Sequence, residues 1–344
     1  MKENIDMSSQ IDFVVPWLDS SDPVWQEQFS YYSQKEKGRM EAARFRNMDI
    51  FQFWFRAVEK YAPWVRKVFL ITNGKFPDWI NKEHPKLVLV KHTDYIPEDI
   101  LPVFNASAIE LQIHRIEGLS EHFVYFNDDF FLNAPVMPDY YFKKGLPCDY
   151  NRETYNLVPI YDSEDKFEIA MCVYSDLGIV NANFNRWKTV CQSPRRWFGF
   201  HLGLRGIILN CMLGRQKKFI GFPYRHYEQP YLKSVLEEVW RKEPGFLNAS
   251  CTRFRGEVSA NQYLFRYWQF ASNRFFPVRN LKGRFFSLRQ DELKNIEAAL
   301  QDPNITSVCL NDTPKCPDNE FRVINTSLKE LFERKFTEKS SFEV

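Results

Sequence analysis

The chain has 344 residues, enough for one large α/β domain with an elaboration or for two modest domains. Its 46 lysines and arginines nearly balance 44 aspartates and glutamates, and the net charge of +2 excludes a protein that coats polyanions through its overall charge. With 44% hydrophobic and 26% charged residues, it is not a disordered chain, a collagen or a coiled coil. The chain has only 13 glycines, so a glycine-rich phosphate cradle is not expected, whereas aromatic residues make up 17% of it.

The sequence contains no run of the roughly 18 apolar residues that a membrane-spanning helix needs, and its start lacks the apolar core of a signal peptide. The seven cysteines are scattered without a C-x-x-C pair, which favours neither a disulfide framework nor a zinc site. We therefore expect a cytoplasmic protein.

Strand-like and helix-like patterns alternate along residues 1–150. Short apolar runs predict strands at residues 11–16, 68–72, 87–90 and 123–126. Apolar residues at three- and four-residue steps from Phe45 to Val58 predict a helix that ends before Pro63. A second helix is expected to begin at Ser107, with Glu110 completing a capping box, and to continue towards the next glycine. This alternation indicates a mostly parallel sheet covered by helices on both faces.

Polar groups follow all four predicted strands. In chain order the residues at the strand ends are Trp17, Asp19 and Asp22, then Asn73 and Gly74, then His92 and Asp94, and finally Asn127, Asp128 and Asp129. Ligands bind beyond the carboxyl ends of parallel strands, so these groups are expected to converge on one edge of the sheet. Each group taken alone is also explained as an ordinary turn former.

Residues 177–227 carry positive charge without a single aspartate or glutamate. The cations are Arg186, Lys188, Arg195, Arg196, Arg205, Arg215, Lys217, Lys218 and Arg225. Aromatic residues lie among them, which suits contact with an anionic membrane surface. The neutral total charge argues against a nucleic-acid partner. The alternative is a solvated face whose acidic partners come from elsewhere in the fold.

Two features stand out in the C-terminal third. Arg253 and Arg255 are two residues apart, so an extended segment would place both on one face. The apolar run 307–310 leads directly into Asn311 and Asp312, which repeats the Asn-Asp pair after the fourth predicted strand. Two strands that each end in such a pair could supply one site from both sides.

Carboxylates at strand ends suit a hard divalent cation, Mg²⁺ or Mn²⁺, which substrate phosphates commonly complete. Asp128 and Asp129 can share one ion only if the chain turns there, because adjacent strand residues point to opposite faces. Guanidinium groups bind phosphate oxygens in bidentate fashion. The candidates are Arg44, Arg46, Arg253 and Arg255. A metal ion together with arginines favours phosphoryl transfer from a nucleotide diphosphate.

These residues lie in segments that resemble the Stealth family of hexose-1-phosphate transferases. The family includes bacterial capsule polymerases and the catalytic subunit of the lysosomal-enzyme N-acetylglucosamine-1-phosphotransferase. Residues 11–25, 44–81 and 104–132 resemble its first two conserved regions, residues 223–240 the third and residues 307–336 the fourth. The motif P-W-L-D-S departs from the commoner T-W-V-[DN]-G but keeps the Trp and the Asp. The long inserted modules of the animal enzymes are absent, so nothing supports a protein acceptor.

The resemblance implies a glycosyltransferase-A-like fold and a divalent cation, Mg²⁺ or Mn²⁺. It implies transfer of a sugar-1-phosphate from a UDP-hexose or UDP-N-acetylhexosamine to a hydroxyl of a lipid-linked or growing glycan, with UMP as the leaving group. Such an enzyme would build bacterial cell-surface polysaccharide. Separately, the basic segment 177–227 predicts that the protein lies on the inner face of the membrane, near lipid-linked acceptors. We divide the chain into a nucleotide-sugar core (1–150), a basic, helical or irregular insertion on the acceptor or membrane side (151–250) and a C-terminal part that completes the site (251–344).

The resemblance also implies roles for single residues. It assigns Trp17, Asp19 and Asp22 to the donor pocket, Arg44 and Arg46 to phosphate, Asn73 and Gly74 to the nucleotide, Glu110, Asn127 and Asn311 to substrate binding, and Asp128 or Asp129 with Asp312 to the metal. The catalytic assignments are Asp19, Asp128, His226 and Arg255, with His226 or an acidic neighbour assisting the acceptor hydroxyl.

Simpler explanations exist for several of these residues. Glu110 could serve only as a capping partner, and His114 could pair with it on the helix surface. His226 could be a packed histidine, and Trp17 and Trp54 could belong to the core. Two rival functions also remain: a metal-dependent glycosyltransferase that releases UDP, and a non-catalytic glycan-binding protein that docks on membranes.

Overall fold

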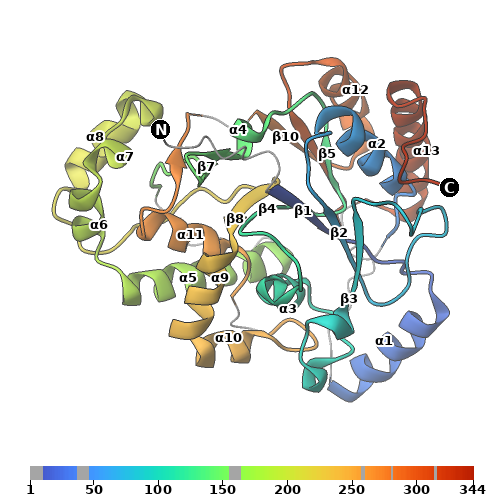
Figure 1. The fold of residues 1–344 in the computed structure, drawn as a ribbon, viewed down its shortest axis with the longest axis horizontal. Helices are drawn as coiled ribbons and strands as arrows, with labels where there is room; N and C mark the ends of the chain where they lie inside the picture. Colours follow the sequence, from blue (N-terminus) through green and yellow to red (C-terminus); the bar gives the residue numbers. More distant parts are fainter. Residues whose placement is uncertain (1–10, 37–45, 155–163, 257–259, 280–281, 314–315) are drawn as a thin grey trace.

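The computed structural model describes residues 11–36, 46–154, 164–256, 260–279, 282–313 and 316–344. A five-stranded sheet in the order β3-β2-β1-β4-β8 lies at its centre (Figure 1). The strands are β1 (Ile11–Pro16), β2 (Val68–Thr72), β3 (Leu87–Lys91), β4 (His122–Tyr125) and β8 (Gln229–Leu232). The first four are parallel, and β8 pairs antiparallel with β4. The expected α/β class with a mostly parallel sheet is therefore confirmed.

Helices cover both faces of this sheet. Figure 1 shows α2 (Phe51–Tyr61) and α13 (Asp318–Lys335) on one side, and α3 (Ala106–Leu111), α9 (Lys233–Lys242) and α11 (Tyr263–Ala271) on the other. The side chains of β2 are all buried, as expected for a strand that is covered twice. The strand order explains the two layers: β1 to β2 and β3 to β4 progress in opposite directions, so right-handed crossovers place α2 and α3 on opposite faces.

Two smaller sheets flank the central one. The first consists of β10 (Gly283–Ser287), β11 (Ser307–Asn311) and β5 (Phe130–Leu132), and the second of β6 (Phe142–Lys143), β7 (Leu146–Asp149) and β9 (Phe276–Pro277). Strand β11 is antiparallel to β5. This pairing brings the C-terminal part beside the turn after β4, where the Leu310 backbone N–H donates to the Asp129 carbonyl at 2.9 Å.

The remaining α-helices are α1 (Pro23–Glu36), α4 (Pro138–Tyr141), α5 (Glu164–Asn183), α6 (Arg186–Gln192), α7 (Pro194–Trp197), α8 (Gly203–Leu213), α10 (Pro244–Ser250) and α12 (Leu293–Gln301). Short 3₁₀ helices are η3 (His92–Asp94), η4 (Glu98–Ile100), η5 (Ile113–Arg115), η6 (Phe200–Leu202) and η7 (Gln290–Glu292). Among the described residues, no helix combines the length and the apolar character needed to cross a membrane. Helices α6 to α8 lie together at one end of the molecule (Figure 1).

The helix boundaries differ from two predictions. The helix expected from Phe45 begins at Phe51, and Phe45 itself lies outside the described residues. The capping box predicted for Ser107 is wrong, because Ser107 already lies in the first turn of α3. Asn105 caps this helix instead, and its side chain accepts a hydrogen bond from the Ser107 backbone N–H at 3.1 Å. Helix α3 then ends at Leu111.

Candidate functional site

The candidate site lies where the strand order of the central sheet reverses. The chain leaves β1 towards β2 on one side and returns to pair β4 with the other side of β1. Ligands of α/β sheets bind at such a switch point, beyond the carboxyl ends of the two strands. Trp17 and Asp19 follow β1, and residues 127–129 follow β4, so both sets lie at this edge.

The chain turns sharply after β4, as sharing of one metal ion by two adjacent aspartates requires. The Phe130 backbone N–H donates to the Asn127 carbonyl at 3.1 Å, which places Asp128 and Asp129 within the turn. The side chain of Asp128 is exposed, whereas that of Asp129 is 14% exposed. Asp128 is therefore the more accessible of the two residues.

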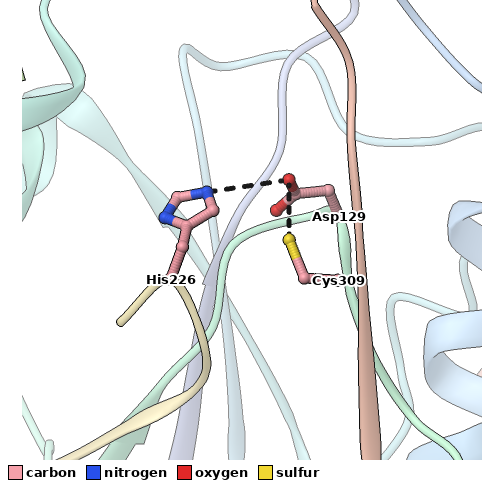
Figure 2. Close-up of side chains that lie close together, drawn as sticks. All are labelled: Asp129, His226 and Cys309. Carbon is pink, nitrogen blue, oxygen red and sulfur yellow. Dashed lines mark hydrogen bonds and ion pairs between the residues drawn. The ribbon is translucent and has the colours of Figure 1, made fainter. Parts of the chain in front are cut away.

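Asp129, His226 and Cys309 meet at this turn, although they come from three distant segments (Figure 2). Asp129 Oδ2 lies 3.8 Å from His226 Nε2 and accepts a hydrogen bond from Cys309 Sγ at 3.6 Å. The potential ligand atoms of the three residues lie within 4.8 Å of one another. We call these residues the Asp129 cluster.

The charge of the Asp129 cluster is not balanced by the described residues around it. Burial raises the pKa of Asp129 well above its ordinary value, and Asp128 raises it further. Burial also lowers the pKa of His226 to about 4, so its imidazole is neutral at pH 7. Asp129 Oδ1 is buried and accepts no hydrogen bond from the described residues. A divalent cation fits here, because it would supply both the missing positive charge and a partner for Oδ1.

Cys309 is the weakest potential ligand of the cluster. Burial raises the pKa of its thiol well above the ordinary value, and Asp129 raises it further. A thiol that stays protonated is a poor metal ligand, since metals bind the thiolate. Cys309 therefore acts as a hydrogen-bond donor to Asp129, and the oxygen atoms of the adjacent carboxylates Asp128 and Asp129 suit a hard cation.

Aromatic rings fix the orientation of His226. The Phe130 ring meets its imidazole edge-on, with 4.8 Å between centroids, and the Tyr224 hydroxyl lies 3.4 Å from Nδ1. A contact at Nδ1 leaves Nε2 directed at Asp129. The sequence left open whether His226 is a packed histidine or a site residue. In the structure, its packing holds the ring in place beside Asp129.

A second group of charges lies at the ends of β1 and β2. Asp19 forms an ion pair with Lys75 at 2.6 Å and accepts a hydrogen bond from the Ser21 backbone N–H at 2.9 Å. Burial alone would raise the pKa of Asp19, but Lys75 and Ser21 lower it overall. Lys75 follows Asn73 and Gly74, and Gly74 has a φ of 126°, which residues with a side chain rarely adopt.

Other strand-end residues have local structural roles. Trp17 stacks on Phe51, with 6.0 Å between ring centroids. Asp22 accepts a hydrogen bond from the Val24 backbone N–H at 3.3 Å and so caps α1. After β3, Asp94 accepts from the Lys91 backbone N–H at 2.7 Å, which matches the turn-former explanation.

Arg46 and Asp312 bind each other. Arg46 Nε and Nη2 donate to the two carboxylate oxygens of Asp312 at 2.8 and 2.9 Å, and Nη1 donates to Asp318 at 3.0 Å. The Asn311 side chain donates to the Asp312 carbonyl at 2.9 Å. Asp312 is thus held outside the Asp129 cluster, and its metal role stays a prediction, as does the phosphate role of Arg46. Arg44 lies outside the described residues.

Glu110 and His114 do not form the surface pair that the sequence suggested. Glu110 is buried, and its Oε1 accepts hydrogen bonds from Tyr125 Oη at 3.1 Å and Gln262 Nε2 at 3.2 Å. The pairing fails because α3 ends before His114, whose ring lies against Trp240 at 5.5 Å. Burial raises the pKa of Glu110 to about 7, while Tyr125 and Arg255 lower it in part.

Replacing Glu110 with glutamine is expected to change how stability depends on pH. Because the folded-state pKa is raised from 4.5 to about 7, the wild-type protein loses stability as pH rises through that window, and Glu110→Gln removes the loss. The variant should be more stable by about 1–3 kcal/mol at pH 8, with the difference vanishing near pH 4. Urea unfolding at both pH values measures it. The exposed Glu330→Gln is the control, and an equal effect there would contradict the prediction.

Sequence reasoning missed three polar residues near the site. Cys309 lies two residues before Asn311 on β11 and so shares its face, which was an available signal. Lys75 directly follows the Asn-Gly pair after β2. Glu228 lies two residues after His226, and burial raises its pKa to about 7. Which of these three polar side chains are buried becomes clear only from the three-dimensional pairing of the strands.

Arg253, a phosphate candidate, is explained by contacts within the fold. Its guanidinium donates to the carbonyls of Pro102 at 2.9 Å and Leu101 at 2.8 Å, and it forms an ion pair with Glu36. Arg255 instead lies close enough to Glu110 to lower its pKa. The two arginines thus have different surroundings.

The fold and the site define an α/β protein with an acidic turn, suited to a metal ion, at the switch point of a mostly parallel sheet. Residues 44–148 match the family model described as Stealth protein CR2, conserved region 2. The chain is 36% identical over 344 residues to the receptor polysaccharide phosphotransferase WefC of Streptococcus gordonii, covering 98% of this chain and 100% of the relative. It is 38% identical over 345 residues to the capsular polysaccharide phosphotransferase WcwK of Streptococcus pneumoniae, with 98% and 100% covered.

The exopolysaccharide phosphotransferase cps2G of Lactiplantibacillus plantarum is 36% identical, with 97% of this chain and 96% of the relative covered. The chain belongs to the Stealth family, which confirms the resemblance found in its sequence. Among solved structures, the galactosyltransferase LgtC in complex with donor and acceptor sugar analogues is similar at 8% identity and a TM-score of 0.40, with 96% of this chain and 98% of that chain covered.

Proposed function

We propose that the protein transfers a sugar-1-phosphate from a UDP-hexose or UDP-N-acetylhexosamine to a hydroxyl of a glycan acceptor during synthesis of bacterial cell-surface polysaccharide. The Asp129 cluster carries this proposal, because an uncompensated acidic turn at a switch point suits a metal-bound diphosphate. The names of the near full-length relatives, which are polysaccharide phosphotransferases, support it.

In this mechanism, Asp128 and Asp129 Oδ1 would hold Mg²⁺ or Mn²⁺. When bound, the ion would supply positive charge to offset the negative charge of the donor diphosphate. Neutral His226 accepts the proton of the acceptor hydroxyl through Nε2, and Asp129 Oδ2, at 3.8 Å, stabilises the imidazolium that forms. The acceptor oxygen then bonds to the sugar-linked phosphorus, and the bond from that phosphorus to the UMP oxygen breaks.

The donor would extend from the metal site towards the ends of β1 and β2. Lys75, which is partly exposed beside Asp19, is placed to bind phosphate or ribose hydroxyls there. Trp17 offers a flat ring for the uracil base or the sugar. Arg255, near buried Glu110, is proposed to neutralise phosphate from the opposite side.

The nucleotide product distinguishes this reaction from the rival one. Incubation with a panel of UDP-sugars, glycan acceptors and Mn²⁺ is expected to release UMP together with a phosphodiester-linked glycan, because the sugar carries its phosphate with it. Chromatography of the nucleotides and phosphorus NMR of the glycan measure both products. UDP as the sole nucleotide product would instead establish an ordinary glycosyltransferase.

We also place the protein at the inner face of the cell membrane, where lipid-linked acceptors are found. The basic segment 177–227 supports this placement. The alternative of acidic partners from elsewhere in the fold applies to Arg186, which is fully buried and pairs with Glu153 at 2.6 Å.

A further inference from the structure

An apolar stripe faces solvent along η6 and α8. Phe200, Leu204, Ile208 and Met212 are 95%, 74%, 49% and 80% exposed. Leu204, Ile208 and Met212 are four residues apart on α8, so their side chains share one face of the helix. Phe200 lies just before them on η6, ahead of the bend at Gly203, where φ is 65°. We call these four residues the α8 face. Single exposed apolar residues are ordinary on a protein surface, but an aligned set of four large ones marks an interaction site.

The α8 face is exposed although α8 itself is firmly attached. On the opposite side of the helix, Gly206 and Asn210 are buried. The Asn210 side chain accepts a hydrogen bond from Arg186 Nη2 at 2.9 Å and donates to the Trp197 carbonyl. These contacts fix the rotation of α8 about its axis, so the apolar stripe cannot turn inwards without breaking a buried polar network.

Positive charges flank the α8 face. The exposed cations within residues 177–227 are Lys188, Arg195, Arg205, Arg215, Lys217 and Lys218. None of them forms an ion pair with another described residue, and residues 177–227 contain no carboxylate side chain. An apolar strip with a cationic border is the composition of helices that lie in the interface of an anionic bilayer.

We propose that the α8 face docks the protein on an anionic lipid bilayer, with the four apolar side chains at the boundary of headgroups and acyl chains and the cations among the lipid phosphates. The inference rests on the membrane placement in the proposed function and names the surface responsible. A second copy of the chain is a poor occupant, because its own cations would face these cations. A soluble polyanion would engage the cations but leave the stripe exposed.

Docking through this face would bring the acceptor side of the enzyme to the membrane. Residues 214–225 connect α8 directly to His226 of the Asp129 cluster. Figure 1 shows α8 at the end of the molecule opposite α13, so the bilayer would meet one end of the protein and leave the α13 end free.

Flotation of the full chain with phosphatidylcholine vesicles, with and without about 30 mol% phosphatidylglycerol, tests the proposal. Wild-type protein should bind the anionic vesicles and bind less as salt rises. Leu204→Ser with Met212→Ser should weaken binding about tenfold or more, since apolar burial is lost. The matched control, Met137→Ser with Val323→Ser, removes side chains that are 65% and 49% exposed elsewhere and should bind as wild type does.

Reversing the charge at Arg215, Lys217 and Lys218 should weaken binding to anionic vesicles as well. Equal binding of wild-type protein to neutral and anionic vesicles, or unchanged binding of the serine variant, would overturn the proposal. So would a wild-type dimer in light scattering that dissociates in the serine variant, which would identify a second copy as the occupant. Circular dichroism confirms that the variants are folded.

Transfer to a short soluble acceptor separates the two proposals. The serine variant at Leu204 and Met212 should retain this activity, because neither residue belongs to the proposed site. If the wild-type protein catalyses transfer but does not bind anionic vesicles, the docking surface is rejected and the proposed reaction stands. Vesicle binding without any transfer would reject the proposed reaction and leave the docking surface standing.

Discussion

Asp129→Asn is expected to reduce sugar-phosphate transfer by about a hundred- to a thousandfold, because the substitution keeps the shape of the side chain and removes the charge that holds the metal. Mn²⁺ should raise the thermal unfolding temperature of the wild-type protein and leave that of the variant unchanged, since a ligand stabilises only the state that binds it. Without metal, the variant should be at least as stable as wild type at pH 8, because a buried and uncompensated carboxylate is gone.

This combination of lost activity with retained stability distinguishes a functional carboxylate from a structural one. Asp139→Asn is the matched control, because the Asp139 side chain is 71% exposed and lies in a loose pair with Lys143 at 3.8 Å. It should leave both transfer and the response to Mn²⁺ unchanged. If Asp129→Asn kept the Mn²⁺-dependent rise in unfolding temperature, the ion would have to bind elsewhere.

The central strands could be predicted because each is an apolar run that the structure buries. The runs at 11–16, 68–72, 87–90 and 123–126 appear as β1 to β4 within one residue at each end. A strand that is buried on both faces is a continuous apolar run, and this run can be recognised without knowing which distant segments pack against it. The boundaries of α3 were less accessible, since Asn105 and Ser107 are both good capping residues.

From the sequence alone, site residues could be predicted only where they directly follow a recognisable strand. Asp128 and Asp129 are recognisable in the sequence as carboxylates beyond a buried strand. His226 was found through the family resemblance, and Cys309 was not found, because its contact with Asp129 depends on the antiparallel pairing of β11 with β5. Such pairings join segments that no local pattern relates.

The contact between Arg46 and Asp312 shows the same limit. Both were assigned to ligand binding because arginine suits phosphate and aspartate suits metal. Those same properties make them suit each other, and the bidentate contact at 2.8 and 2.9 Å joins the start of the second described segment to the C-terminal part. Residue type predicts that a charge will find a partner, whereas only the fold determines which partner.

The second large effect is expected on stability, at the buried ion pair between Asp149 at the end of β7 and Arg266 on α11. Both side chains are fully buried, with Nε to Oδ2 at 2.7 Å and Nη2 to Oδ1 at 2.9 Å. Gln229 also donates to Asp149 at 3.0 Å, and Arg266 donates to the Pro223 carbonyl at 2.9 Å. The pair therefore anchors both ends of the segment that carries His226.

Arg266→Met is expected to lower the free energy of unfolding by about 3–5 kcal/mol at pH 8, because it leaves the Asp149 carboxylate buried without a counter-charge. Burial alone would raise the pKa of Asp149, but Arg266 lowers it overall in the wild-type protein. Without Arg266, the buried carboxylate should gain a proton as pH falls, so the loss in free energy of unfolding should become smaller. Urea unfolding at pH 8 and pH 5 measures both effects.

Two further variants test whether the uncompensated charge is the cause. Arg334→Met removes one partner of an exposed pair, in which the side chains are 67% and 42% exposed, and should cost less than about 1 kcal/mol. Arg266→Met combined with Asp149→Leu removes both buried charges and should recover much of the stability that the single substitution loses. A double variant as unstable as Arg266→Met would mean that the loss comes from the packing of the Arg266 stem and its contact with Pro223, and not from the charge left on Asp149.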